Sequence, residues 1–144
     1  HCSMDIHVYA TVKSIGISQA RIKKIAAYTL KQLKQPQAEL SIHCIGTYKM
    51  RNMNKQYRGK DYATDVLSFA AQEGTMAVGT DLGDIFICVP VIRRQAREWS
   101  VSYTEEFFRM MIHGILHVLG YDHHTKREAD EMFGLQEKIL QRVL

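Results

Sequence analysis

The sequence predicts a single α+β domain in which a small mixed four-stranded sheet packs against about five helices. Its 144 residues, 46% of them apolar, are enough for one well-buried core and too few for two comfortable ones. Four short runs are rich in β-forming residues, and longer segments between and after them repeat apolar residues at helical spacing. No repeat, low-complexity tract or linker divides the chain, so we expect one domain over residues 1–144.

The first quarter of the chain predicts a strand followed by a helix. Residues 4–11 alternate imperfectly between apolar and polar and are rich in β-forming side chains, which favours a strand. Ser18 is a suitable N-cap for the next segment, whose apolar residues recur at helical spacing. Because the residue before a proline disfavours helical geometry, this helix should end before Pro36.

The middle of the chain predicts three further strands and a short basic helix. Residues 40–45 form the second predicted strand, and residues 49–58 form a helix that a glycine ends. Residues 65–70 and 84–89 have the composition of the third and fourth strands. Between these two strands, the small and glycine-containing segment 72–80 predicts a loop, the most mobile part of the chain.

The second half of the chain predicts three helices. Pro90 suits the first turn of a helix that runs to about residue 100, since the missing N–H is not needed there. Thr104 is the predicted N-cap of the next helix, where Glu105 and Glu106 lie near the positive end of the helix dipole. A capping box that begins at Thr125 predicts the start of a terminal helix.

Three histidines around the end of the predicted helix after Thr104 have the spacing of ligands to one tetrahedral metal ion. His113 and His117 are four residues apart and therefore share one helix face. Gly120 can reverse the chain after the helix and bring His123 back over that face as a third ligand. A fourth position left for water is typical of a catalytic zinc site.

The same spacing occurs in the long zinc-protease signature, but one residue differs. Those proteases carry a glutamate directly after the first histidine as general base, whereas this chain has Gly114. A metal-bound water with a pKa near 7 can still supply hydroxide, so hydrolysis remains open. The missing base argues against peptide bonds as the substrate.

The charge of the chain is mildly basic and unevenly distributed. The formal net charge is +4, and residues 49–60 contain five basic side chains and no acidic one. Such a segment attracts a polyanion by releasing counterions from phosphates, although a solvated helix face has the same composition. Arg93, Arg94 and Arg97 form a second short cluster with the same two interpretations.

Other features predict a soluble, cytoplasmic protein. No stretch approaches the roughly 18 apolar residues of a membrane span, and the start lacks the pattern of a signal peptide. Cys44 and Cys88 lie in apolar runs without paired spacing, which predicts buried, reduced thiols. Because Met4 opens the first strand-like run, residues 1–3 are interpreted as the remnant of an expression tag.

The motifs of this chain closely resemble those of the YbeY family, the metal-dependent endoribonucleases of bacteria and organelles that act in rRNA maturation. The most specific is the stretch from His113 to His123, which contains the three histidines and the Gly-Tyr-Asp turn. The upstream segments 57–61, 64–69 and 83–85 follow in the order of that family. Ala70 departs from the family, which usually has proline there, and this affects the expected shape of the next loop.

The resemblance implies a zinc-dependent endoribonuclease that prefers single strands and acts in 16S rRNA 3′-end maturation and ribosome quality control. It implies that His113, His117 and His123 bind one zinc ion and that Arg58 is the basic residue required for cleavage. A guanidinium suits this role, because it can bind two phosphoryl oxygens at once. The implied partners are ribosomal RNA, small-subunit ribosomal proteins and a ribosome-assembly GTPase, with no membrane.

Five further residues have alternative roles. Glu106 could hold a ligand imidazole or only stabilise the helix start, and Asp122 could support a ligand or only make the turn. Ser68 and Asp84 either line the cleft or tie strand ends together. His124 should point away from the metal, as a surface residue or a contact at a helix start.

Two other classes of function share part of this pattern. A zincin-type metallopeptidase would need a general base from elsewhere in place of Gly114. A non-catalytic ribosome-assembly factor with structural zinc would need a fourth protein ligand, because structural sites are closed. The endoribonuclease is the leading hypothesis.

Overall fold

The computed structural model of the chain describes residues 4–71 and 81–144 and contains four strands and five helices in this part. In chain order, the elements are β1 (Asp5–Ala10), α1 (Gln19–Gln32), β2 (Glu39–Ile45), α2 (Thr47–Arg58), β3 (Val66–Ala70), β4 (Asp81–Cys88), α3 (Val89–Trp99), α4 (Tyr103–Val118) and α5 (Lys126–Val143). Every strand and helix predicted from the sequence is present. The two predictions that concern residues 1–3 and 72–80 lie outside the described residues.

The sheet has the order β1-β2-β4-β3 and is mixed. β1 pairs with β2 and β2 with β4 in parallel, while β3 pairs with β4 in the antiparallel sense and forms one edge. Parallel neighbours need crossover connections, and α1 supplies the one between β1 and β2. The prediction of a mixed four-stranded sheet is confirmed.

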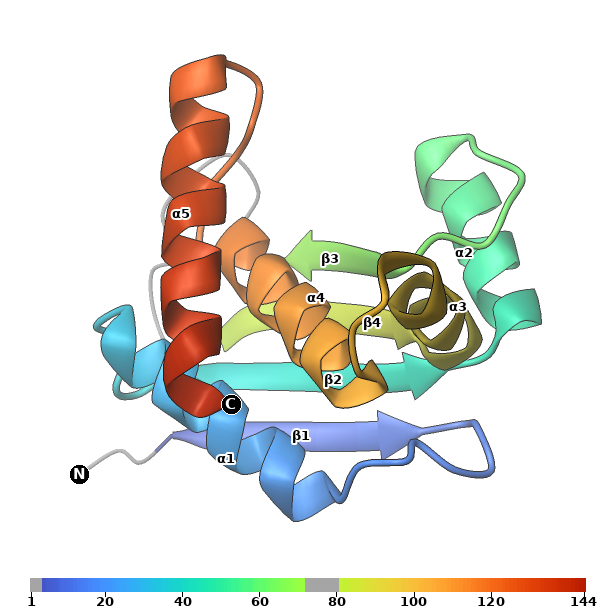
Figure 1. Cartoon of the computed structure of the whole chain (residues 1–144), viewed down its shortest axis with the longest axis horizontal. Helices are drawn as coiled ribbons and strands as arrows, with labels where there is room; N and C mark the ends of the chain where they lie inside the picture. The colour runs from blue at the N-terminus through green and yellow to red at the C-terminus, as the bar shows by residue number, and fades with distance from the viewer. Residues whose placement is uncertain (1–3, 72–80) are drawn as a thin grey trace.

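The helices are arranged around the sheet as Figure 1 shows. α1 and α4 pack on one face of the sheet, and α5 lies further out, against α4 and α1. α2 and α3 lie at the end of the molecule where β2 and β4 finish. α4 contacts both β3 and β4, so its side chains lie directly over the edge of the sheet that β3 forms.

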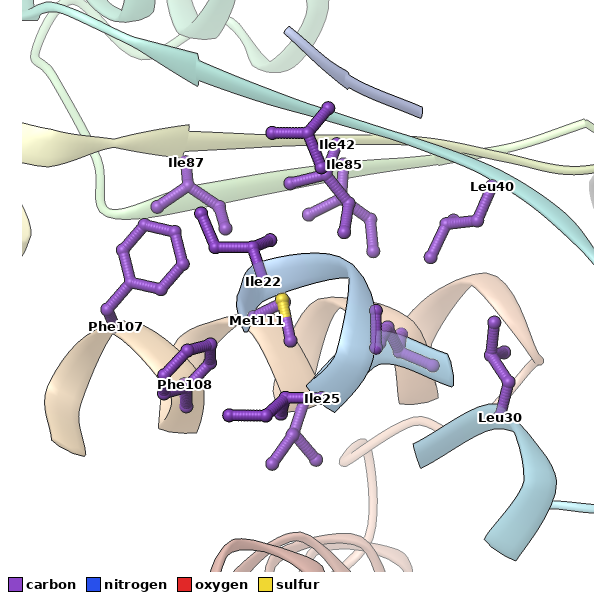
Figure 2. Close-up of a cluster of buried hydrophobic side chains, with 14 of the residues drawn as sticks. Ile22, Ile25, Leu30, Leu40, Ile42, Ile85, Ile87, Phe107, Phe108 and Met111 are labelled. Atoms are coloured by element: carbon purple, nitrogen blue, oxygen red, sulfur yellow. The ribbon is translucent and has the colours of Figure 1, made fainter. Parts of the chain in front are cut away.

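The main core lies between the sheet and the helices α1 and α4 (Figure 2). Ile42 and Ile85 point from the central strands toward Ile22, Phe108 and other helix side chains, and all four are fully buried. A second, smaller cluster of buried residues lies at the ends of the strands, formed by Ile45, Met50, Leu67, Cys88 and Val91. Burial of these apolar side chains is the main force that holds α4 in place on the sheet.

Three predicted starts differ from the structure. α2 begins at Thr47, two residues before its predicted start. The N-cap of α4 is Ser102 rather than Thr104, and its hydroxyl accepts a hydrogen bond from the Glu105 amide at 3.0 Å. β4 begins at Asp81, three residues before the predicted start, because the strand continues through Gly83. Gly83 has φ +124°, and a Cβ there would lie 2.0 Å from the carbonyl oxygen of Phe69, so only glycine fits this irregular pairing.

Two smaller sequence predictions can also be compared with the structure. Cys44 and Cys88 are buried and free, as expected, and burial raises the pKa of the Cys44 thiol to about 12. Among the described residues, none of the helices combines the length and apolar character needed to cross a bilayer.

Candidate metal centre

The end of α4 brings the three predicted histidines together. His113 and His117 lie one turn apart, and their Nε2 atoms are 3.1 Å from each other. After the C-cap Leu119, Gly120 adopts φ +98°, and the amides of Gly120 and Tyr121 bond back to the carbonyls of His117 and Leu116 at 3.0 Å. This reversal returns the chain over the helix end.

His123 completes the group after that turn. One ring nitrogen from each of His113, His117 and His123 lies within 4.8 Å of the others. Among the described residues, no further His, Cys, Asp or Glu joins this group. The carboxylate of Asp122 accepts the backbone N–H of His123 at 2.7 Å and holds the turn that presents it.

The surroundings keep two of the imidazoles neutral. Burial lowers the pKa of His113 below its ordinary value of 6.5. Burial, together with the neighbouring His113 and His123, lowers the pKa of His117 to about 4. A neutral imidazole is the form that ligates a metal, so these two residues need not release a proton at pH 7.

The donor set fits a single transition-metal ion of the zinc type. Tetrahedral zinc holds nitrogen ligands at about 2.0–2.1 Å, which places neighbouring nitrogens roughly 3.4 Å apart. The 3.1 Å between the Nε2 atoms of His113 and His117 is close to this spacing, and His123 is within reach. Three imidazoles suit zinc, copper, iron or nickel, so the donors alone do not select the metal.

Gly114 faces the sheet and not the metal group. A Cβ at this position would lie 2.9 Å from Cγ2 of Ile85 and 3.2 Å from Oγ of Ser68. Glycine therefore allows α4 to approach β3 and β4 closely. A glutamate here would point into the packed interface, so position 114 cannot carry a protease-type base in this fold.

Arg58 contacts the edge strand β3, on which α4, the helix of His113 and His117, also packs. Its Nη2 donates to the carbonyl oxygen of Ser68 at 3.1 Å, and its guanidinium carbon lies 4.9 Å from the centre of the Phe69 ring. The hydroxyl of Ser68 donates to the carbonyl of Gly114 at 3.2 Å, one residue after His113. Ser68 thus joins Arg58, through β3, to the helix that carries two of the histidines.

Asp84 points away from the metal centre. It pairs in register with Phe69, and because side chains alternate along a strand, both lie on the sheet face opposite to Ser68. Its Oδ1 lies 2.9 Å from Nε2 of His43 on β2. For Asp84, the structure supports the alternative in which the residue ties two strands together. Ser68 instead ties β3 to α4, through the carbonyl of Gly114.

His124 is exposed, as the sequence predicts. Its side chain is 82% accessible, and its Nε2 pairs with Asp122 at 2.8 Å. Asp122 therefore contacts the backbone of His123 and the ring of His124, and its role is to shape the turn.

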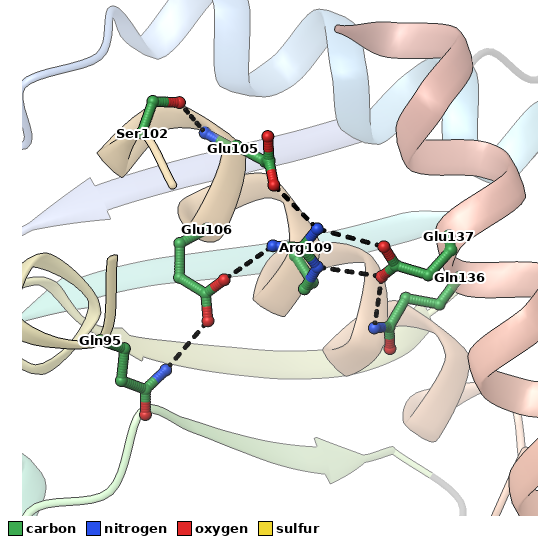
Figure 3. A network of polar contacts seen from close by, with 7 residues as sticks. All are labelled: Gln95, Ser102, Glu105, Glu106, Arg109, Gln136 and Glu137. Atoms are coloured by element: carbon green, nitrogen blue, oxygen red, sulfur yellow. Dashed lines mark hydrogen bonds and ion pairs between the residues drawn. The ribbon is translucent and has the colours of Figure 1, made fainter. Parts of the chain in front are cut away.

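Glu106 lies in the first turn of α4, as the second of its two alternatives expects, and it also joins a wider network, which Figure 3 shows. The side chain is only 6% exposed, and its carboxylate accepts from Arg109 at 2.8 Å and from Gln95 at 3.1 Å. Arg109 also pairs with Glu105 at 2.9 Å and with Glu137 of α5 at 3.0 Å. Glu106 therefore belongs to a partly buried ion-pair network that links α4 to α3 and α5, and it does not orient a ligand imidazole.

Two residues of α5 border the metal centre, and neither was predicted from the sequence. Oε1 of Gln136 lies 2.7 Å from Nδ1 of His113. The ring of Phe133 is 43% exposed and stacks near His113 and His123 at centroid distances of 5.8 and 6.0 Å. Both contacts depend on how α5 packs against α4, for which the sequence offers no local signal.

Comparisons with known proteins find relatives over most of this chain. The sequence model described as Endoribonuclease YbeY matches residues 8–144. A protein named Endoribonuclease YbeY from Oenococcus oeni is 43% identical over 127 residues, which cover 83% of this chain and 82% of that protein. Another protein of that name, from a Sulfurihydrogenibium species, is 41% identical over 133 residues, covering 92% and 88%.

A solved structure has the same fold. The solution structure of TM1509 from Thermotoga maritima matches with a TM-score of 0.68 at 26% identity and covers 96% of this chain and 88% of that one. The family match spans almost the whole chain and includes the helix, the turn and the three histidines. This chain therefore belongs to the family of YbeY endoribonucleases.

Proposed function

We propose that this chain is a zinc-dependent endoribonuclease that cleaves single-stranded RNA. The observation that carries the proposal is the convergence of His113, His117 and His123 on one point, in a chain whose relatives are named endoribonucleases. We further propose, from the resemblance to the family, that the substrate is ribosomal RNA and that the enzyme acts in 16S rRNA 3′-end maturation and ribosome quality control in the cytoplasm. Small-subunit ribosomal proteins and an assembly GTPase are its proposed partners.

The histidines would hold zinc, and Arg58 would act on the scissile phosphate. A bound zinc ion supplies Lewis-acid chemistry, polarising a phosphoryl oxygen or lowering the pKa of water. Phosphodiester cleavage increases negative charge on the phosphoryl oxygens, and the exposed Arg58 guanidinium can bind two of them at once. Its contacts with Ser68 and Phe69 restrict its motion, which favours a fixed orientation toward the substrate.

The other two functions have less support. A zincin-type peptidase needs a base beside the metal, whereas Gly114 is packed against the sheet and Glu106 is paired with Arg109 and Gln95. A structural zinc site needs a fourth protein ligand, and among the described residues none joins the three histidines.

A cleavage assay with purified protein separates these functions. Single-stranded RNA, duplex RNA and peptide substrates are incubated with and without a chelator, using the wild type, His117→Ala and His124→Ala. The wild type should cleave single-stranded RNA and leave peptide intact, and the chelator and His117→Ala should each abolish cleavage. His124→Ala is the matched control, because the neighbouring exposed histidine is outside the metal group, and it should retain activity.

The metal content and fold of the same proteins complete the test. We expect zinc in the wild type and in His124→Ala, with little in His117→Ala. Circular dichroism should show that His117→Ala remains folded, because the core of α1, α4 and the sheet does not depend on the ion. RNA cleavage that persists in chelator and in His117→Ala would refute the proposed metal dependence.

Arg58 is tested by single-turnover cleavage at saturating RNA. Arg58→Ala should keep its zinc and lose most of the cleavage rate, since only a group complementary to charge in the transition state affects the chemical step under these conditions. Arg58→Lys should restore it only partly, because an ammonium lacks the planar fork. A wild-type rate in Arg58→Ala would remove Arg58 from the chemistry.

A further inference from the structure

Gln136 is a buried polar residue whose amide oxygen and amide NH2 group have different partners. It lies on α5 and is 5% exposed. Its Oε1 lies 2.7 Å from Nδ1 of His113 on α4, and its Nε2 lies 3.1 Å from Oε2 of Glu137. The side chain therefore connects a carboxylate to the first histidine of the metal centre.

Glu137 determines which way the Gln136 amide must face. An ionised carboxylate only accepts hydrogen bonds, so it can pair with the NH2 group of Gln136 but not with its oxygen. Burial opposes ionisation of Glu137, but hydrogen bonds from Arg109 and Gln136 lower the pKa of this carboxyl below its ordinary value. Arg109 donates to both carboxylate oxygens, from Nε at 3.0 Å and from Nη2 at 3.1 Å, as Figure 3 shows.

The orientation of the amide in turn fixes the proton on His113. With its NH2 group bound to Glu137, Gln136 presents its carbonyl oxygen to His113, and this oxygen can only accept. Nδ1 of His113 must then carry the hydrogen, which leaves the lone pair on Nε2. Nε2 is the atom that faces Nε2 of His117, 3.1 Å away.

We propose that Gln136 is a positioning residue that holds His113 in the Nδ1–H tautomer and in the ring orientation needed to bind the metal through Nε2. Arg109 and Glu137 keep the amide of Gln136 in the required direction. The inference rests on the proposed metal centre, and it assigns to α5 a direct part in building it. A partner of this kind on the second nitrogen of a ligand histidine affects metal affinity by about 10- to 100-fold.

The test combines two measurements on Gln136→Leu. Nitrogen-15 NMR of the metal-free protein at pH 8 reports the tautomer of His113, and competition with a chelator reports zinc affinity. The wild type should carry the hydrogen on Nδ1. Gln136→Leu should lose this preference and bind zinc about 10- to 100-fold more weakly.

A matched control removes a glutamine from the same polar network at a distance from the histidines. Gln95 on α3 donates to Glu106, which also pairs with Arg109. Gln95→Leu should leave the tautomer and the zinc affinity of the wild type unchanged, although it removes a similar hydrogen bond. If Gln95→Leu and Gln136→Leu lost the Nδ1–H tautomer and zinc affinity to the same extent, the effect would be one of general packing, and the proposal would be overturned.

A second variant keeps the proposal testable if Gln136→Leu fails to fold. Glu137→Gln leaves Gln136 in place but allows its amide to take either direction, so the tautomer of His113 should become mixed. A wild-type tautomer and affinity in the folded variant would overturn the inference. If the wild type itself did not bind zinc, the proposed metal centre would be wrong, while the tautomer in the metal-free protein would still decide the role of Gln136.

Discussion

At the scale of single residues, Gly114 and Gly134 provide a matched test of close packing. Both are helical glycines, but a Cβ at Gly114 would meet Ile85 and Ser68 within 3.2 Å, whereas nothing lies within 4 Å of one at Gly134. We expect Gly114→Ala to lower the free energy of unfolding by roughly 1–2 kcal/mol, because overpacking outweighs the gain in helix propensity. Gly134→Ala should raise it by up to about 1 kcal/mol. Urea denaturation measures both, and a stabilised Gly114→Ala would contradict the close approach of α4 to the sheet.

The pKa of His117 predicts how the stability of the metal-free protein depends on pH. The unfolded chain binds a proton at this imidazole below pH 6.5, whereas the folded protein does so only near pH 4. Since the unfolded state binds more protons between these values, the free energy of unfolding should fall as the pH is lowered from 6.5 to about 4. His117→Leu in chelator should weaken this dependence. The measurement is urea denaturation at several pH values between 4 and 6.5. If the free energy of unfolding depended on pH equally in the wild type and in His117→Leu, His117 would not be buried in its neutral form.

The predictions at the residue scale succeeded where a local rule applied. A spacing of four on a helix placed His113 and His117 on one face without any knowledge of the rest of the fold. The contacts of Gln136 and of Glu106 were not predicted, because each depends on which helix packs beside α4. A sequence pattern carries little information about such contacts between elements.

At the scale of elements, the start of α4 gives a prediction that separates two candidate caps. Ser102 accepts the Glu105 amide at 3.0 Å, whereas Thr104 lies inside the first turn. Ser102→Ala should therefore lower the free energy of unfolding by about 1 kcal/mol. Thr104→Ala should change it by less than roughly 0.5 kcal/mol, since an ordinary helix position has no cap to lose. Thermal or urea unfolding of the two variants compares them directly, and a larger loss in Thr104→Ala would restore the prediction made from the sequence.

Element boundaries were predicted well where side chains bond to the nearby backbone. The capping box from Thr125 to Glu128 and the cap at Ser18 are present as expected. For α4, the sequence predicted Thr104 as the cap and missed Ser102, two residues earlier, which caps the helix in the structure. The start of β4 was placed too late, because the irregular pairing around Gly83 is determined by the neighbouring strands β2 and β3.

At the scale of the whole molecule, the edge strand β3 lies between the basic helix α2 and α4, the helix that carries His113 and His117. β3 forms the edge, and its residue Ser68 contacts Arg58 through its carbonyl and Gly114 through its hydroxyl. The sequence predicted four strands and a mixed sheet but gave no basis for placing β3 at the edge. That Arg58 and α4 both contact Ser68 of β3 therefore emerged only from the structure.

The same arrangement predicts which basic residues attract RNA over a longer range. On α2, Lys49 and Lys55 are exposed, whereas Arg51 is held by Asp61 at 2.8 Å. Each phosphate contact releases counterions, so the logarithm of the affinity falls with the logarithm of the salt concentration. Removing one contact should reduce the slope of this line by about one unit. We expect this change for Lys49→Ala and for Lys55→Ala and a much smaller one for Arg51→Ala, because Asp61 already occupies its guanidinium.

The measurement is the affinity for a single-stranded RNA between about 50 and 200 mM salt, in chelator so that cleavage does not interfere. Lys24→Ala is the control, since this exposed lysine lies on α1, on the other side of the molecule from α2 in Figure 1. Its slope should equal that of the wild type. Equal reductions in Lys24→Ala and Lys55→Ala would mean that the net charge of the protein attracts RNA. A reduction confined to Lys49→Ala and Lys55→Ala would place the RNA backbone along α2. Arg58 is the last residue of that helix and contacts Ser68 of β3, which in turn contacts α4 next to His113. RNA bound along α2 would therefore be directed toward the proposed catalytic residues.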